Sequence, residues 1–342
     1  MTKFLIGLLF CITTSWSNNS WSQSPTRHRE RLVVDTSLFL PVNGVTQYLE
    51  IKGSTRTKPV LLFIHGGPSW SATPMNRKYN QSLSKDFIFV SWDQRNSGKS
   101  QTDTTATLNP ELYVEDAHVV TQYLKRTFHQ NKIFVVGHSW GSLIGAMLVR
   151  KYPTDYAAFI SVGQFVNARK SEMLARDFVM QQASLQKDTA TLNALATIPF
   201  SEKEGYKNGF DDKFKFRMLS GKYLTSKKAV DMPNPIQLYS DYSALDWMTP
   251  AMRDSKQLFN YTEKTNLFQH NKFKLLVYFF VGKYDYTTSA EIAKQYFKTI
   301  KAPKKKLFVF EHSGHGPNWQ EPTLFHKRLL EVAADNKTNK FS

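Results

Sequence analysis

Cysteine is almost absent from this sequence: Cys11 is the only one among 342 residues. A disulfide within the chain is therefore excluded, and so is a metal site built from several cysteines. Internal repeats and long low-complexity tracts are also missing, which argues against a repeat architecture. Hydrophobic residues make up 41% of the chain, enough to bury one large core, and the length permits one or two domains.

The first 22 residues have the pattern of a secretory signal peptide. Lys3 gives a basic start, Phe4–Ile12 form a short apolar core, and Ser22 is a small residue at the expected cleavage point. The apolar run is too short to cross a bilayer comfortably. We therefore expect residues 1–22 to be removed and the protein to be exported, to the periplasm or outside the cell. The alternatives are a retained membrane anchor and a lipid attached to Cys11.

The chain is basic, with a formal net charge of +17 at pH 7. The plainer account is that lysine and arginine side chains are spread over the surface. The functional account is a weak attraction to anionic membranes, cell-wall polymers or acidic substrates. No recognised nucleic-acid-binding module, with aromatic residues interleaved in a basic stripe, is present. We therefore expect no nucleic-acid partner.

A Gly-x-Ser-x-Gly pattern occupies residues 137–141, with Ser139 at its centre. It follows the β-branched run Ile133–Val136 and precedes Ser142–Val149, an apolar stretch of helical character. A serine on a sharp turn between a strand and a helix exposes its hydroxyl, and glycines beside it allow the strained backbone. The N-terminus of the following helix directs free N–H groups at an anion that forms there. Ser139 is therefore the candidate nucleophile.

A serine nucleophile needs a histidine base and an acid that orients it, and in this architecture the chain order is serine, acid, histidine. The strand-like run Lys274–Val281 leads to Asp285, and the run Lys306–Glu311 leads to His315. In a parallel sheet, both side chains would reach the same edge as Ser139. We predict a catalytic triad of Ser139, Asp285 and His315.

The negative charge that develops on the substrate oxygen needs two backbone N–H donors. Trp140, directly after the nucleophile, supplies one of them. The strand-like run Val60–Ile64 leads into a glycine-rich loop, and we assign the N–H of Gly67 in this loop as the second. Each such donor is typically worth about 3–4 kcal/mol in the transition state. This chemistry requires neither a metal ion nor an organic cofactor.

Five motifs in this order resemble the proline iminopeptidase-like branch of the α/β-hydrolase superfamily, over about residues 30–335. They are His65-Gly66-Gly67-Pro68, Asp93-Gln94-Arg95 with Gly98 and Ser100, Gly137-x-Ser139-Trp140-Gly141-Ser142, Gly282-x-Tyr284-Asp285 and Gly314-His315. The resemblance implies an α/β-hydrolase fold and makes Asp93 part of a structural signature rather than a second triad acid. Ser69, Asn96 and His138 stand where the branch usually has glycine.

Three other histidines compete with His315. His312 lies in the same loop, but the glycines that flank His315 favour His315 as the base. His65 belongs to the glycine-rich loop and is expected to order it. His138 neighbours the nucleophile, although its side chain is expected to point away in the strained turn.

The remaining pattern is typical of an α/β protein. Further buried strands are predicted at Phe87–Trp92 and Tyr156–Gly163, and Asn43-Gly44 marks a hairpin turn before Val45–Ile51. Asn109-Pro110 marks the start of a helix. Strands that alternate with helices indicate a mostly parallel sheet with helices on both faces.

About 110 residues separate the strands that end at Gly163 and begin at Lys274, which is too long for a single loop. Helical periodicity appears within this stretch at Glu172–Ala183 and Thr189–Ala196. We therefore expect a helical cap at residues 164–270, inserted between two parts of a hydrolase core at 23–163 and 271–342. A cap over a nucleophile excludes water and selects the substrate.

The expected reaction is acyl transfer to water on a small molecule or a short peptide. The first hypothesis is an aminopeptidase of proline iminopeptidase type, the second a carboxylic-ester hydrolase, and the third a non-catalytic binding protein. The resemblance places the acids that bind a substrate amino terminus in the cap, with Glu172 first and Asp241 and Asp246 as alternatives. A cap carboxylate facing Ser139 would favour the peptidase, because a desolvated ammonium group needs one, and an apolar cap would favour the esterase.

Overall fold

A β-sheet runs through the part of the chain that the structure describes. The computed structural model describes residues 33–224, 229–231 and 234–338, so the predicted signal peptide lies outside it. Within these ranges the sheet has eight strands. In spatial order they are β1 (Val34–Val42), β2 (Val45–Gly53), β4 (Ile88–Trp92), β3 (Val60–Ile64), β5 (Ile133–His138), β6 (Tyr156–Val162), β9 (Leu276–Gly282) and β10 (Lys305–Phe310). The β1–β2 and β2–β4 pairs are antiparallel and the others are parallel, which confirms the predicted mostly parallel sheet.

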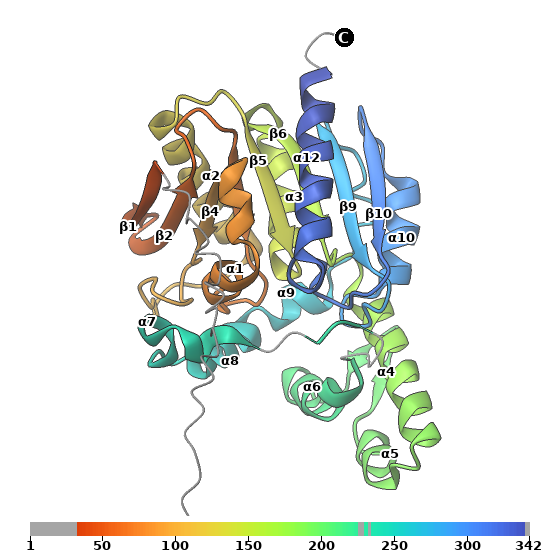
Figure 1. Cartoon of the computed structure of the whole chain (residues 1–342). Coiled ribbons are helices and arrows are strands. Elements are labelled where there is room, and N and C mark those ends of the chain that lie inside the picture. Colours follow the sequence, from red (N-terminus) through yellow and green to blue (C-terminus); the bar gives the residue numbers. More distant parts are fainter. Residues whose placement is uncertain (1–32, 225–228, 232–233, 339–342) are drawn as a thin grey trace, which may run out of the picture. The chain divides into compact units, whose positions relative to one another are not determined.

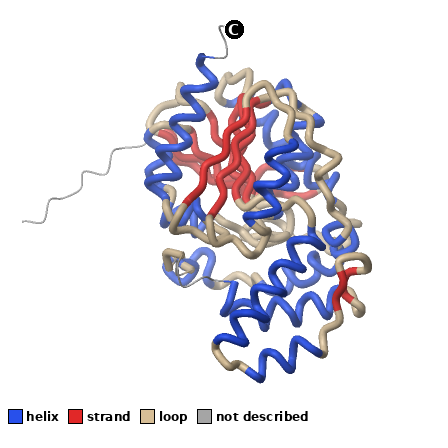
Figure 2. The backbone as a smooth tube through the Cα atoms, turned by 90° about the vertical axis from the view of Figure 1, so that its right-hand side faces the viewer, coloured by secondary structure: helices blue, strands red, loops and turns tan. Residues whose placement is uncertain are grey.

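Helices cover both faces of this sheet (Figure 1 and Figure 2). One face is covered by α2 (Pro110–Thr127), α3 (Trp140–Lys151) and α10 (Ala290–Thr299), and the other by α1 (Thr73–Tyr79), α11 (Pro317–Gln320) and α12 (Pro322–Thr338). Short 3-10 turns lie at η1 (Gln81–Lys85) and η2 (Pro153–Asp155). Successive strand residues point to opposite faces, so Leu62 and Ile64 join the first core while Leu61 and Phe63 join the second.

Local sequence signals account for several element boundaries. Asn43 and Gly44 both have positive φ, 43° and 85°, as the tight hairpin between β1 and β2 requires. At the start of α2, the side chain of Asn109 accepts a hydrogen bond from the N–H of Leu112 at 2.9 Å. This bond satisfies one of the free donors of the first turn, and Pro110 has no N–H to satisfy. Both predicted boundaries are therefore confirmed.

The chain between β6 and β9 is mainly helical. Its elements are α4 (Ala168–Leu185), α5 (Thr189–Ala196), β7 (Phe200–Ser201), β8 (Gly205–Tyr206), α6 (Phe210–Leu224), η3 (Pro235–Leu238), α7 (Ser240–Ser243), α8 (Met248–Gln257) and α9 (Phe259–Glu263). We call this segment the cap, and Figure 1 shows it below the sheet. Helices α4, α5 and α6 enclose a small core of their own around Val179 and Phe216. No helix in the described ranges is long and apolar enough to cross a membrane.

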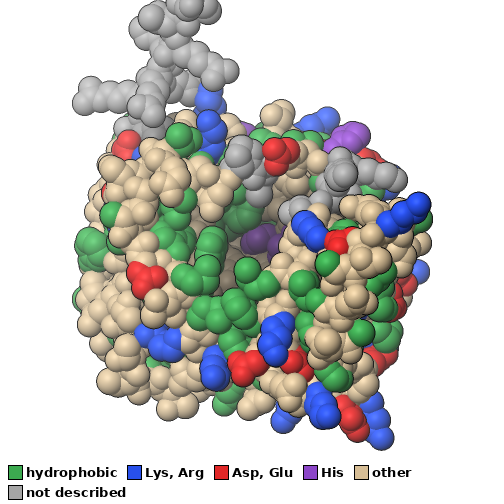
Figure 3. Space-filling view, turned by 90° about the horizontal axis from the view of Figure 1, so that it is seen from below, with side chains coloured by type: hydrophobic (Ala, Val, Ile, Leu, Met, Phe, Trp, Pro, Cys, Tyr) green, Lys and Arg blue, Asp and Glu red, His purple; other side chains and the backbone are tan. Residues whose placement is uncertain are grey.

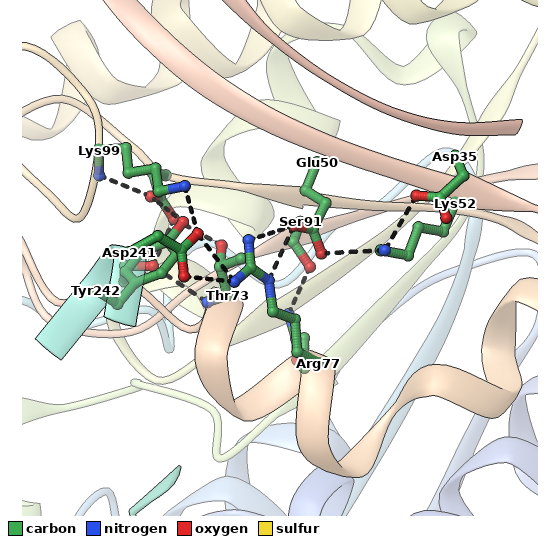
Figure 4. Close-up of polar contacts among 12 residues, drawn as sticks. Asp35, Glu50, Lys52, Thr73, Arg77, Ser91, Lys99, Asp241 and Tyr242 are labelled. Carbon is green, nitrogen blue, oxygen red and sulfur yellow. Dashed lines mark hydrogen bonds and ion pairs between the residues drawn. The ribbon is translucent and has the colours of Figure 1, made fainter. Parts of the chain in front are cut away.

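Polar contacts join α7 of the cap to the sheet and to α1 (Figure 4). The hydroxyl of Tyr242 donates to the buried carboxylate of Asp93 at 2.8 Å. Beside it, Asp241 pairs with Arg77 at 2.9 Å and with Lys99. Arg77 also pairs at 2.6 Å with Glu50 of β2. This part of the cap is therefore fixed to the core by several charged contacts.

A buried ion pair closes the loop after β4 onto α2. The guanidinium of Arg95 donates two hydrogen bonds to the carboxylate of Asp116, at 2.7 and 3.0 Å, and both side chains are buried. Asn43 and Gln47 donate to the same carboxylate at 2.8 Å each. A paired and hydrogen-bonded carboxylate of this kind is costly to remove, because the remaining charge then stays buried without a partner.

We expect Asp116→Asn to lower the free energy of unfolding by about 3 kcal/mol, since the buried charge of Arg95 would keep only Asp103, 3.6 Å away, as a counterion. The matched control is Glu115→Gln, which breaks the exposed Glu115–Lys151 pair and should cost no more than about 1 kcal/mol. Chemical denaturation measures both. Similar small losses in the two variants would contradict the importance given to the buried pair.

Candidate active site

Ser139 lies at the tip of the turn between β5 and α3. Its backbone has φ 54° and ψ −120°, a strained conformation for a residue other than glycine. The N–H of Ser139 donates to the carbonyl of Val162 at 3.0 Å, which fixes the turn against β6. A Cβ at Gly137 would lie 2.4 Å from the carbonyl oxygen of Gly141, and a Cβ at Gly141 would lie 2.1 Å from that of Ile64. Only glycine fits at either position.

Asp285 and His315 meet at the same edge of the sheet, after β9 and β10. The Nδ1 atom of His315 lies 3.0 Å from Oδ2 of Asp285. The other carboxylate oxygen accepts hydrogen bonds from the N–H groups of Thr287 and Thr288 at 2.9 and 3.0 Å, and the Thr288 hydroxyl donates to Oδ2 at 2.9 Å.

These contacts determine the charge of Asp285 and the tautomer of His315. Burial alone would raise the pKa of Asp285, but His315 and the hydrogen bonds of Thr288 outweigh burial and lower it to about 2. The carboxylate is therefore ionised at neutral pH and can only accept a hydrogen bond from Nδ1–H of His315. That leaves the Nε2 lone pair of a neutral His315 free to take a proton.

Ser139 and His315 line the same cavity. Among the described residues, no hydrogen bond is recorded between the hydroxyl of Ser139 and the ring of His315. Contacts of this kind are often long before substrate binds and shorten in the complex. The arrangement therefore has the parts of a triad in the chain order that the sequence predicts.

The N–H groups of Gly67 and Trp140 have no hydrogen-bond acceptor among the described residues. Trp140 is the first residue of α3, where a helix leaves N–H groups unpaired. His65 orders the loop of Gly67: the N–H of Gln94 donates to its Nε2 at 3.0 Å, and its Nδ1 lies 2.7 Å from the carbonyl of Gly66. Burial lowers the pKa of His65 to about 4, so the ring is neutral and donates from Nδ1.

The other candidate residues occupy different positions. His312 is exposed, and its recorded hydrogen bonds involve its backbone N–H and carbonyl. The Nε2 atom of His138 lies 2.9 Å from the carbonyl of His315, and burial, together with the neighbouring His315, lowers the pKa of His138 to about 3. Asp93 is bound by Ser71, Thr73 and Tyr242. The pairing of His315 with Asp285 is therefore the arrangement that the structure records.

The cavity over Ser139 has a volume of about 450 Å³. Figure 3 shows it as a hollow with a histidine at its floor and hydrophobic side chains around it. Its lining consists of Gly66, Gly67, Pro68, Trp70, Ser71, Ala72, Pro74, Met75, His138, Ser139, Asn234, Ile236, Trp247, Ala251, Ser255, His315 and Trp319. None of these described lining residues is aspartate or glutamate.

The three cap acids considered for binding a substrate amine have other partners. Glu172 is buried within the cap, where it accepts a hydrogen bond from the hydroxyl of Tyr206 at 2.6 Å and pairs with Arg217. The expectation that Glu172 faces Ser139 is therefore corrected, because α4 turns this side chain into the interior of the cap. Asp246 accepts from two backbone N–H groups at the start of α8, each at 3.0 Å.

Asp241 is held by the cations at the joint between α7 and the core. Burial alone would raise the pKa of this carboxyl, but Arg77 and Lys99 outweigh burial and lower it to about 2. Both of these cations come from the core side of the joint. Asp241 therefore contributes to fixing the cap.

Several residues of the site were not identified from the sequence. Thr288 supports Asp285, and part of the signal was present: an aspartate side chain often accepts a hydrogen bond from the backbone two residues further on, as it does here from Thr287. Trp70 and Trp247 lie in the cavity wall with ring centroids 5.4 Å apart, and neither has a sequence signal that separates it from a core aromatic residue. Within the described ranges, no group of three or more His, Cys, Asp and Glu side chains could hold a metal ion.

Comparisons with known proteins identify the family of this chain. A model of the α/β hydrolase fold family matches residues 59–322. The protein named probable aminopeptidase YbaC, from Bacillus subtilis, is 28% identical over 317 residues, which cover 86% of this chain and 95% of that protein. These matches confirm the predicted resemblance to the proline iminopeptidase-like branch.

Two solved structures share the fold at low sequence identity. The proline iminopeptidase of Mycobacterium smegmatis superposes with a TM-score of 0.66 at 14% identity, covering 89% of this chain and 100% of that one. A proline iminopeptidase-related protein from Thermus thermophilus gives a TM-score of 0.64 at 18% identity, covering 88% and 98%. The predicted α/β-hydrolase fold is therefore confirmed.

We expect His315→Ala to abolish turnover and Asp285→Asn to reduce kcat by about 10⁴-fold, because the asparagine would favour the unproductive tautomer of the histidine. His312→Ala is the control within the same loop and should keep the wild-type rate. Steady-state kinetics on any accepted substrate measures all three. An inactive His312→Ala beside an active His315→Ala would show that the base has been assigned to the wrong histidine.

Proposed function

The chain belongs to the α/β-hydrolase fold family, and on this premise we propose that it is an exported serine hydrolase of aminopeptidase type. The fold and the relatives support a hydrolase. The proposal adds that Ser139, His315 and Asp285 form its catalytic triad and that its substrates are peptides with a free amino terminus. The single observation that carries it is that His315, paired with Asp285, lines the same cavity as Ser139 on its strained turn.

The mechanism follows from the atoms at the site. Nε2 of His315 removes the proton of the Ser139 hydroxyl while Oγ attacks the substrate carbonyl carbon. The N–H groups of Gly67 and Trp140 stabilise the oxyanion, and Asp285 stabilises the imidazolium. His315 then protonates the leaving amine. Water, deprotonated by the same nitrogen, releases the acyl group from Ser139.

The size of the cavity and the full-length relative support an aminopeptidase. A hollow of about 450 Å³ suits a small group rather than a long chain that passes through it. The similarity to the probable aminopeptidase of Bacillus subtilis extends over 86% of this chain, so it includes a large part of the cap as well as of the core.

Asp231 is our candidate for the carboxylate that binds the substrate amine. The segment 229–231 is attached to the loop of His315: the N–H of Val230 donates to the carbonyl of His312 at 2.8 Å, and Gln320 donates to the carbonyl of Val230 at 2.8 Å. The side chain of Asp231 is exposed. Together with burial, its charge raises the pKa of Tyr79 on α1, the helix whose Pro74 and Met75 line the cavity.

A carboxylic-ester hydrolase is the second candidate. The observation in its favour is the lining of the cavity, which is mostly hydrophobic and includes no carboxylate among its described residues. A neutral ester would enter such a pocket without the cost of desolvating an ammonium group. The same triad and oxyanion donors would cleave it.

A panel of substrates separates these candidates. We expect proline, alanine and leucine arylamides with a free amino group to be cleaved, and Asp231→Asn to lower kcat/KM on them about tenfold, since a charged hydrogen bond is worth about 1.5–3 kcal/mol. Short p-nitrophenyl esters carry no ammonium group, so their kcat/KM should change little in Asp231→Asn. The control is Glu202→Gln, which alters an exposed cap acid and should change the ester kcat/KM equally little. Equal losses on both substrate classes would remove Asp231 from amine binding. Cleavage of the esters alone would favour the second candidate.

Export gives a separate prediction. The mature protein isolated from its native host should begin at or near Gln23, because the signal peptide would be removed after Ser22. N-terminal sequencing or intact mass measurement of the exported fraction checks this. Intact protein that begins at Met1 and is recovered from the cytosol would contradict it.

A further inference from the structure

Three buried polar side chains from distant parts of the chain meet beside the loop of Gly67. Asp254 of α8 is fully buried. Its Oδ2 atom accepts a hydrogen bond from the hydroxyl of Ser69 and another, at 2.8 Å, from the side-chain amide of Asn96. Its Oδ1 atom accepts one from Nε of Arg253 at 2.7 Å. Both carboxylate oxygens are therefore occupied, and Asp254 is not among the residues that line the cavity.

Both core partners of Asp254 have a strained backbone. Ser69 has φ 57° and Asn96 has φ 62°, in the left-handed region that residues other than glycine rarely adopt. Ser69 lies two residues after Gly67, and its backbone N would be 2.9 Å from a Cβ placed on Gly67. The conformation of Ser69 therefore bears directly on the position of the Gly67 N–H. Strained residues persist only when the surrounding contacts hold them.

The helix that carries Asp254 also forms a wall of the substrate cavity. Ala251 and Ser255, four residues apart on one face of α8, line the cavity, and so does Trp247, which precedes the helix. Asp254 is directly adjacent to Ser255 and extends to the core loops. One rigid helix thus contacts both the space for the substrate and the loop that holds an oxyanion donor.

We propose that Asp254 is a positioning residue for the oxyanion hole. Its hydrogen bonds to Ser69 and Asn96 orient the N–H of Gly67 toward the oxyanion, so this orientation depends on the position of α8. The inference rests on the proposed function, because it assigns Gly67 as an oxyanion donor. Asp254 acts through Ser69 and does not touch the substrate. Through these buried contacts, a residue of the cap affects stabilisation of the transition state, and therefore kcat, rather than substrate affinity.

The test is the kinetics of Asp254→Asn in the full-length mature protein, with Asp212→Asn, another buried cap acid, as the matched control. We expect Asp254→Asn to lower kcat about 100-fold, as the loss of one oxyanion donor does, with KM changed by less than about threefold. Binding of a boronic acid, which forms a tetrahedral adduct at the serine, should weaken by the same factor as kcat/KM. Asp212→Asn should leave kcat unchanged.

A rescue experiment separates positioning from a general loss of stability. Glycine adopts positive φ without strain, so the triple variant Ser69→Gly, Asn96→Gly, Asp254→Asn should recover at least about tenfold in kcat over Asp254→Asn alone. If Asp254→Asn does not fold, Ser69→Ala decides, since it removes the hydrogen bond that holds the strained backbone at residue 69 and leaves Asp254 in place. It should show the same kcat loss with little change in KM.

Two results would overturn the inference. The first is a wild-type kcat in folded Asp254→Asn, or in Ser69→Ala if Asp254→Asn does not fold. The second is a triple variant that is no more active than Asp254→Asn. Failure of the proposed function is distinguishable, because then the wild type itself would show no turnover that depends on Ser139.

Discussion

The close packing of the nucleophile turn against the ends of β3 and β6 is the constraint on which the site depends. Gly141 lies so near the carbonyl of Ile64 that a methyl group would overlap it, and the N–H of Ser139 is tied to Val162. These contacts are made by the backbone, so they fix the strained turn independently of most side chains. The start of α3 is fixed with it, and the N–H of Trp140, at the first position of this helix, has no acceptor among the described residues.

The cap consists of two parts with different relations to the core. Helices α4, α5 and α6 bury their own hydrophobic cluster, and Glu172 belongs to that interior. Helices α7 and α8 instead reach the core through buried polar contacts, in which Tyr242 binds Asp93 and Asp254 binds Ser69. Because α8 also walls the cavity, the contacts that hold it determine the shape of the space over Ser139. The part of the cap that walls the cavity is thus tied to the core by buried polar contacts.

Much of the fold, and the pairing of His315 with Asp285 near Ser139, could be predicted from the sequence, because the signals are local. The buried strands are mostly continuous apolar runs. Ser139 directly follows one, and Asp285 and His315 lie in the loops that follow two others. The position of Glu172 could not be predicted, because its surroundings depend on how α4 packs against α6 and on the side chains of Tyr206 and Arg217. Asp254 was missed for the same reason: its partners are 158 and 185 residues away, and nothing in its own sequence context marks it. Ser69 and Asn96 appeared only as departures from the glycines usual at their positions, and their shared partner emerges in three dimensions.

The central claim is that Ser139 is an activated nucleophile. The most direct measurement is to treat the mature protein with a fluorophosphonate and to locate the adduct by peptide mass spectrometry, with Ser139→Ala treated in parallel. The account predicts one adduct per chain, on Ser139, and none in the variant, whose fold should be intact by circular dichroism. An adduct on another serine, or labelling that persists in Ser139→Ala, would contradict it.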